Sequence, residues 1–479
     1  MLDVDNGPAF TAEDNGSRGG VKALASLVMA LVALAPAPAS AQSRLGSSCR
    51  PGQTAISGFL LWCDSGSRKF RYALPSDIPP TPAEGYTSRP PWYPALRDQL
   101  VADSAPACPV SGRVTLTSPV IDPQDLDLII PQGELIFDHV TPIDHGYIGV
   151  RTLRLAAEAR AMSDYVPIRT PADAQVLSIA TVGSPTSLSI TLAFGCDTYA
   201  TLIVVNRVAG ALGQYQDEVL SRGYVTPQRL RVLAGTIIGE QRDNPLDFMV
   251  EDGASWLSGY VAPFSYASEA WKPFVVNPWP YFSPDLQELY ESRMQRTVEP
   301  RWGKIDLDVR WTAAGNWFLD GTVGSSGRPL SDFQGQTEIT GGPVPGKNSS
   351  SWSHLAIVPH AVQPRRWMFS TGWWQNPAGD PVQLVIDLQP GQPTPAELTR
   401  DAGIVVYQLK NWMYSPNDTG PPSNAPRPIN YDILPYFLKG IVVVQVNEDE
   451  SITMEIIPST NGALPTFTRF DGDSRVYRR

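Results

Sequence analysis

The stretch Val166-Pro-Ile-Arg-Thr-Pro-Ala-Asp173, continued by Ala174-Gln-Val-Leu-Ser-Ile179, holds two short apolar, β-branched runs on either side of a proline and an aspartate. Runs of this kind, bounded by Pro, Gly, Asp or Ser, are typical of β-strands joined by turns. The pattern recurs at residues 126–130, 188–194, 201–205 and 231–238. We therefore predict an all-β domain over residues 113–252, interrupted by one acidic helix at 215–222.

A second series of strand-like runs follows Gly303. It comprises residues 304–311, 317–322, 354–358, 367–371, 383–387, 404–409, 441–447 and 451–457. About eight strands at this spacing are typical of a sandwich or a barrel. The prediction is a mainly β protein with a second antiparallel β-barrel over residues 303–479, and the terminal Arg475-Val-Tyr-Arg-Arg479 is interpreted as a solvated tail.

The segment between the two series, residues 253–302, is aromatic and rich in loop residues. Within it, Ser283-Pro284-Asp285 has the pattern of a helix start, with Ser as N-cap and Pro in the first turn. We predict one bridging helix that ends before Pro300. Its expected buried stripe is Leu286, Leu289, Tyr290 and Met294.

The first 41 residues have the pattern of a secretory signal peptide. Basic Arg18 and Lys22 precede an apolar stretch at 23–35, and Ala39-Ser40-Ala41 provides a small-x-small cleavage site. The alternative is a membrane anchor, which needs about 20 apolar residues, whereas prolines interrupt this stretch at 36 and 38. We therefore expect cleavage near Ala41, a periplasmic or secreted location, and no transmembrane span in the mature chain.

The four cysteines, Cys49, Cys63, Cys108 and Cys196, all follow the predicted cleavage site. An even number of cysteines in an oxidising compartment favours disulfides. Their spacings match no zinc motif. The simplest pairing is Cys49–Cys63 and Cys108–Cys196, which makes residues 42–112 a disulfide-tied segment with a proline-rich connector.

The chain has 479 residues, which is long enough for two or three domains. Its net charge is −11, and it contains no run of Lys and Arg that would form a basic face. Nucleic acid is therefore not expected as a partner.

Several phrases of the first β-domain occur in one order. They are Pro131-Gln-Gly133, His139, Asp144-His145, Val166 to Asp173, Ala234-Gly-Thr-Ile-Ile-Gly239 and Leu246-Asp-Phe248. In this order they resemble the lysostaphin/LytM-type zinc endopeptidases, which cut peptidoglycan cross-bridges. The resemblance covers about 120 residues and implies a LytM-like β-fold with a zinc site in a groove.

The catalytic positions of that family are poorly kept. His145 stands where the first zinc-binding His belongs, but Gly149 replaces the Asp ligand four residues later. Asn206 or its neighbour replaces the strand His, and Pro245-Leu-Asp247 replaces the final His-x-His. A catalytic zinc needs three protein ligands, an open water position and a base. Only His145 and Asp247 remain as metal ligands in register.

His139 and Asp144 lie beside His145 in the sequence and are able to supplement these two ligands. The alternative is structural, with the Asp and His side chains capping a turn around Pro142. The candidate binding residues are therefore His139, Asp144, His145, Asn206 and Asp247. We expect no cofactor, with zinc as the alternative.

Aromatic residues are concentrated in the second half of the chain. Gly315-Asn316-Trp317 resembles the Gly-x-Trp phrase of lipocalin-like barrels, in which the Trp closes one end and the mouth takes an apolar ligand. Trp373-Trp374 has the composition of a sugar-stacking surface. The alternative is that these tryptophans fill the barrel and the interface between domains.

Three functional hypotheses follow. The preferred one is an exported, non-catalytic protein that binds an envelope glycan or peptide, or another exported protein. The second is a divergent zinc metallopeptidase acting on peptidoglycan through the His145 region. The third is a lipocalin-like carrier of an apolar small molecule.

Overall fold

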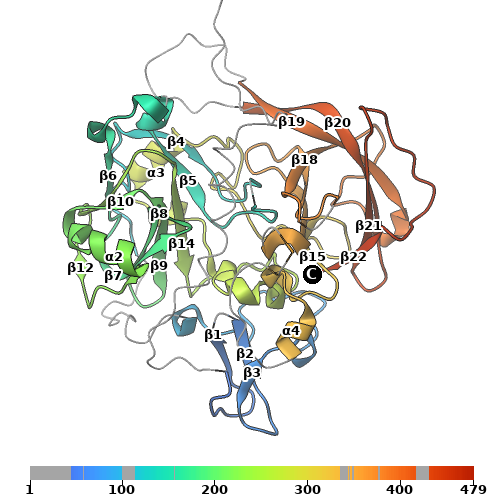
Figure 1. Cartoon of the computed structure of the whole chain (residues 1–479), viewed down its shortest axis with the longest axis horizontal. Helices are drawn as coiled ribbons and strands as arrows, with labels where there is room; N and C mark the ends of the chain where they lie inside the picture. The colour runs from blue at the N-terminus through green and yellow to red at the C-terminus, as the bar shows by residue number, and fades with distance from the viewer. Residues whose placement is uncertain are drawn as a thin grey trace, which may run out of the picture.

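The structure is a computed structural model that describes residues 45–57, 59–99, 114–136, 138–155, 157–334, 344, 346–347, 350–375, 378–416 and 431–479. Two β-rich bodies lie side by side, with a small sheet below them (Figure 1). The prediction of a mainly β chain with a second antiparallel barrel is confirmed. The predicted signal peptide lies outside the described residues.

The small sheet belongs to the N-terminal segment, for which the sequence predicted only a disulfide-tied segment with a proline-rich connector. It consists of β1 (Thr54–Ser57), β2 (Phe59–Cys63) and β3 (Phe70–Tyr72). The predicted Cys49–Cys63 disulfide is present, with a Cα–Cα distance of 5.7 Å. Cys196 is also disulfide-bonded, but its predicted partner Cys108 lies outside the described residues.

We predict that replacing both Cys49 and Cys63 by serine lowers the stability of this sheet by about 3 kcal/mol. The disulfide joins residues with a sequence separation of 14, and a loop of this length restricts the conformations of the unfolded chain. Limited proteolysis should then cut residues 45–75 before the two large β-bodies. Equal protease resistance of the variant and the oxidised wild type would contradict this expectation.

The first large body contains two antiparallel sheets. In spatial order the larger sheet holds β11 (Tyr224–Val225), β7 (Ala174–Val182), β8 (Ser184–Ala193), β9 (Thr198–Val205), β14 (Leu246–Asp252), β5 (Gly146–Val150) and β4 (Leu126–Ile130), with β12 (Arg231–Val232) also paired to β7. The smaller sheet holds β10 (Arg207–Val208), β13 (Ile237–Gln241) and β6 (Val166–Arg169). The predicted acidic helix is α2 (Gln216–Arg222).

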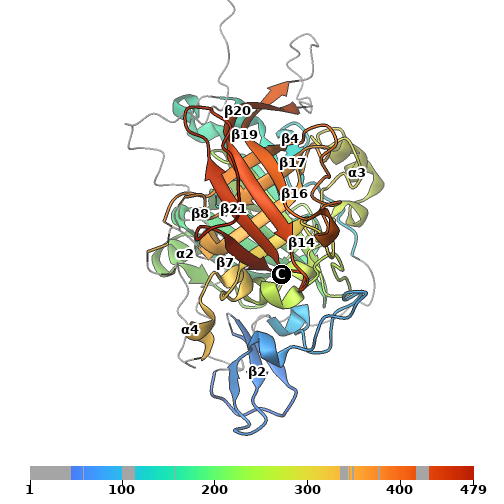
Figure 2. The same ribbon diagram turned by 90° about the vertical axis from the view of Figure 1, so that its right-hand side faces the viewer.

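The second body is a closed eight-stranded barrel, whose strands cross the face shown in Figure 2. Its strands are β15 (Gly315–Leu319), β16 (His354–Pro359), β17 (Trp367–Thr371), β18 (Val382–Asp387), β19 (Val405–Pro416), β20 (Tyr431–Val446), β21 (Ile452–Pro458) and β22 (Arg475–Arg478). Alternate residues of these strands, such as Leu355, Ile357 and Phe369, are fully buried and pack together in one apolar cluster. This alternation is expected where one face of each strand points into the barrel.

Two predictions about this barrel were wrong. Residues 304–311 form no strand, because Asp306 and Asp308 instead accept hydrogen bonds from the backbone N–H groups of Gly259 (2.8 Å) and Val261 (3.0 Å). Residues 475–478 are not a solvated tail. They form β22, which closes the barrel by pairing with both β15 and β21 and buries Tyr477 completely.

The predicted bridging helix is present as α3 (Pro284–Glu291). It ends at Glu291, several residues earlier than expected. Leu286, Tyr290 and Met294 are buried in the core of the first body, and Leu289 packs against that core. In the described ranges, no helix has the length and apolar character needed to cross a membrane.

The two large bodies share an apolar interface. Ala356, Val358, Met368 and Val385 lie on the outer face of β16, β17 and β18, and they form one buried cluster with Leu135 of the first body. The linker before α3 adds two short 3-10 helices, η8 (Pro263–Glu269) and η9 (Lys272–Phe274). Residues of this part of the linker pack against Leu177, Ala193 and Tyr199 of the large sheet, and Trp271 contacts Asp144, one of the predicted site residues.

Candidate functional site at the junction of the linker and the large sheet

His145 lies immediately before β5, and Asp247 lies near the start of β14. The two strands are antiparallel neighbours, with Asp247 opposite Tyr147. This pairing places His145 Nε2 at 3.2 Å from Asp247 Oδ2. The structure therefore brings together the two residues that the sequence predicted as metal ligands, although they are about a hundred positions apart in the chain.

Asp144 contacts the other nitrogen of the same imidazole. Its Oδ1 lies 3.0 Å from His145 Nδ1. The ring of His139 lies nearly perpendicular to that of His145, with the centroids 5.8 Å apart. His145 is thus held between two carboxylates, one at each ring nitrogen, and its side chain is 7% exposed.

The linker covers these residues. Trp271 donates a hydrogen bond from its indole nitrogen to Asp144 Oδ2 at 2.9 Å. Lys272 is also buried, and its ammonium forms an ion pair with Glu269 at 3.0 Å. We call the following six residues the His145 centre: His139, Asp144, His145, Asp247, Trp271 and Lys272.

Most charges of the His145 centre support one another, although burial raises the pKa of Asp247 despite its contact with His145. Although burial disfavours the imidazolium, the carboxylates of Asp247 and Asp144 raise the pKa of His145 to about 9. Burial also opposes the ionisation of Asp144, but the His145 hydrogen bond and the Lys272 ammonium hold its pKa below the usual range. At neutral pH, His145 is therefore a buried cation paired with carboxylates.

Two neighbouring groups are kept neutral. Burial, together with the nearby His145, lowers the pKa of His139 to about 3. Burial and the nearby Asp144 carboxylate raise the pKa of Glu251, on β14, to about 8. His139 within the centre and Glu251 beside it are thus both uncharged at neutral pH.

The His145 centre does not fit a catalytic zinc ion. Asp144 and Asp247 contact opposite nitrogens of the imidazole, so both cannot bind one ion together with His145. A zinc at Nε2 would have His145 and Asp247 as ligands, whereas a catalytic zinc takes three protein ligands. Within the described ranges, no three His, Cys, Asp or Glu side chains are grouped so that they could hold a metal ion.

Gly149, which stands where the LytM-type family has its Asp ligand, lies too far from His145 to share a site with it. Residues 146–150 form the extended strand β5, so four residues separate His145 and Gly149 by about 13 Å at roughly 3.3 Å per residue. A side chain at Gly149 would not reach an ion bound by His145. The sequence expectation that Gly149 lies at the same site as His145 does not hold in this geometry.

Asn206 and Pro245 lie several residues along the strands from His145, beyond Asp247. Asp247 pairs with Ile203 of β9 on one side and with Tyr147 of β5 on the other. Along the strand direction, Asn206 and His145 therefore lie on opposite sides of Asp247. The Asn206 Oδ1 accepts backbone hydrogen bonds from Arg242 at 2.7 Å and Asp243 at 2.9 Å. Asn206 thus stabilises the turn before β14 instead of joining the predicted binding residues around His145.

The aromatic candidates of the barrel are mostly covered. Trp317 is fully buried inside the barrel and donates to the Ala313 carbonyl at 3.0 Å. The ring of Trp373 lies 4.1 Å from the Arg475 guanidinium and 5.7 Å from the Trp352 ring. These contacts favour the structural interpretation of these tryptophans over sugar stacking at Trp373.

Sequence reasoning missed Trp271, Lys272, Glu269 and Glu251. Trp271 meets Asp144 across 127 positions, and the aromatic linker shows no motif for such a contact. The amino-acid composition does not indicate that a lysine such as Lys272 is buried. The one available signal was Glu251 itself, a carboxylate that directly follows the continuous apolar run Phe248-Met-Val250.

A scan against protein-family models finds no match, and a search of curated proteins finds none either.

Proposed function

We propose that this chain is an exported, non-catalytic protein of the cell envelope that binds an envelope glycan or peptide. In this proposal the LytM-like region has kept a β-framework and has lost the zinc chemistry. The His145 centre acts as an ionic junction that holds the linker against the large sheet. The observation that carries the proposal is that both ring nitrogens of His145 contact carboxylates beneath Trp271 and Lys272.

This arrangement opposes hydrolysis for a chemical reason. A metallopeptidase needs an open metal position for water and a base that accepts its proton. Here the imidazole is a cation with both nitrogens engaged, and a second buried cation, Lys272, lies close to the carboxylate of Asp144. The carrier hypothesis has less support, because the side chains inside the barrel pack against one another.

The test uses the mature chain purified after expression with zinc in the medium. We expect well under one equivalent of zinc by metal analysis and no release of soluble fragments from purified peptidoglycan sacculi. We also expect the protein to co-sediment with the sacculi. A catalytically active LytM-type endopeptidase serves as the positive control for hydrolysis.

One equivalent of tightly bound zinc, together with fragment release that is lost in His145→Ala, would support the metallopeptidase instead. An absence of both hydrolysis and co-sedimentation would remove the support for an envelope-binding role. Binding without hydrolysis is the outcome that the closed His145 centre leads us to expect.

A further inference from the structure

Trp311 differs from every other tryptophan of the chain. All thirteen tryptophans lie in the described ranges, and twelve of them are buried or half-buried. Trp311 alone is exposed, with 51% of its surface accessible. An indole in this position contributes little to a hydrophobic core.

The backbone of Trp311 is also in an unfavourable conformation. Its φ angle is 61°, in the left-handed region that bulky residues rarely adopt. A glycine or an asparagine suits such a position better. Exposure and strain together indicate that the ring adds little to stability, and strained residues of this kind cluster at functional sites.

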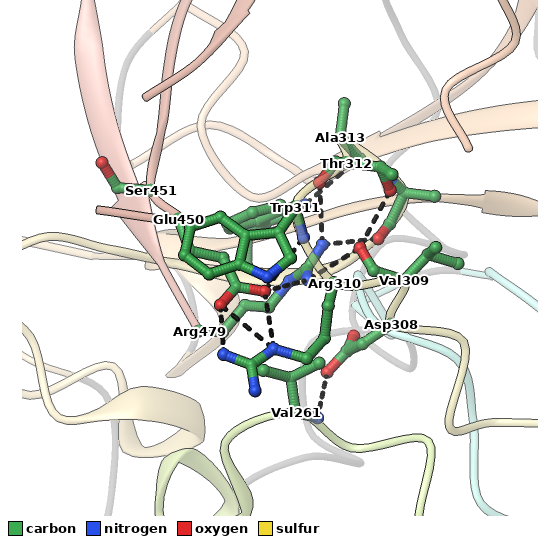
Figure 3. Close-up of polar contacts among 12 residues, drawn as sticks. Val261, Asp308, Val309, Arg310, Trp311, Thr312, Ala313, Glu450, Ser451 and Arg479 are labelled. Carbon is green, nitrogen blue, oxygen red and sulfur yellow. Dashed lines mark hydrogen bonds and ion pairs between the residues drawn. The ribbon is translucent and has the colours of Figure 1, made fainter. Parts of the chain in front are cut away.

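A clamp of charged groups holds the loop in this conformation (Figure 3). Glu450 accepts the backbone N–H of Trp311 at 3.0 Å. The same carboxylate pairs with the guanidinium of Arg310 at 2.7 Å, and Arg479 lies 3.6 Å from it. Arg310 also donates to the carbonyl of Pro82 at 2.5 Å, which ties the loop to the N-terminal segment.

Arg479 fixes the rest of the loop. Its guanidinium donates to the carbonyls of Val309, Thr312 and Ala314 at 2.6 to 3.0 Å. It also lies 4.0 Å from the ring of the buried Trp317. Arg479 therefore fixes the backbone around the exposed indole and connects it to the barrel core.

We propose that Trp311 is the platform on which the protein binds a glycan of β-linked, equatorially substituted hexopyranoses. The Arg310 guanidinium lies over the indole, 5.6 Å from its centroid. The flat C–H face of an equatorially substituted pyranose would stack on the opposite face of the ring, and the hydroxyl groups at its edge would meet the polar groups around it. The inference rests on the proposed function and names its binding surface. It places that surface in the barrel, away from the closed His145 centre.

The size and charge of the platform favour a sugar over other partners. One indole plane matches one pyranose ring, whereas a stable protein interface buries about 800 Å² on each partner. A lipid surface would require several apolar anchors and a basic flank, and the chain has a net charge of −11. Aromatic faces and a fixed polar rim are the features that recognise a sugar.

The test compares Trp311→Gly with Arg229→Gly in the full mature chain. Arg229 is an exposed residue of the first body with a similar left-handed φ of 52°, so its replacement relieves the backbone without removing an aromatic ring. The probes are chitotetraose, followed by ligand-observed NMR, and purified peptidoglycan sacculi in sedimentation.

We expect Trp311→Gly to bind both probes roughly tenfold more weakly, with a melting temperature that is unchanged or about 2 °C higher. Arg229→Gly should bind like the wild type and show the same small gain in stability. Trp311→Phe should keep part of the affinity, which guards against a failure of the glycine variant to fold.

Four results would overturn the inference. Wild-type binding to sacculi with equal binding by Trp311→Gly would reject the platform and leave the envelope-binding proposal standing. A melting temperature that falls by several degrees in both Trp311 variants would show that the ring is structural. Wild-type protein that binds neither probe would reject both proposals, and Trp311-dependent binding to lipid vesicles instead would identify a membrane contact.

Discussion

Replacement of His145 by alanine is expected to lower the free energy of unfolding by about 3–5 kcal/mol. The variant removes the imidazolium that lies 3.0 Å from Asp144 and 3.2 Å from Asp247. It leaves two buried carboxylates facing each other without that cation, in a region that Trp271 shields from water. Chemical denaturation at pH 7, followed by circular dichroism, measures the effect.

Two controls make the result specific. Arg222→Ala removes an exposed i,i+4 pair with Glu218 and should cost at most about 0.5 kcal/mol. The double variant His145→Ala, Asp247→Ala should be less destabilised than the sum of the single variants, because removing one carboxylate relieves the repulsion left by the loss of the imidazole. Strict additivity would mean that the two side chains are not coupled and would contradict the ionic junction.

The coarse architecture was predictable because it depends on local patterns. Short β-branched runs such as Val166–Arg169 and Trp367–Thr371 became strands, since alternation between buried and exposed positions is recorded directly in the sequence. The Pro284 helix followed from its N-terminal signals. The failures at 304–311 and at Arg475–Arg478 arose where tertiary contacts decide the outcome. Buried aspartates tie down the first of these segments, and pairing at the barrel seam orders the second.

Only the part of the candidate site that lies on or beside the β-strands was predictable from the sequence. His145 and Asp247 meet because β5 and β14 are neighbours, and the resemblance had placed both in one domain. The resemblance also placed Asn206 there, but the extended backbone puts this residue several positions further along the strands, beyond Asp247. The linker residues that close the site have no periodicity or motif that relates them to His145.

The final prediction concerns Glu251 and pH. Its pKa rises from an ordinary value of 4.5 to about 8 in the folded protein, because it is buried and lies near Asp144. Below pH 4.5 both the folded and the unfolded chain carry the proton. Between pH 4.5 and 8 only the folded chain keeps it, so the Glu251 contribution to stability is lost as the pH rises through this window.

Glu251→Gln should remove this dependence. The free energy of unfolding of the variant, relative to the wild type, is expected to increase by at most about 1.4 kcal/mol per pH unit between pH 5 and 8, up to about 4 kcal/mol in total. His139 and His354 do not obscure the comparison. Burial lowers the pKa of each to about 3, so they make both proteins less stable in acid to the same extent. Denaturant midpoints measured across this range for both proteins provide the test, and parallel curves would show that Glu251 ionises in the folded state as it does in the unfolded chain.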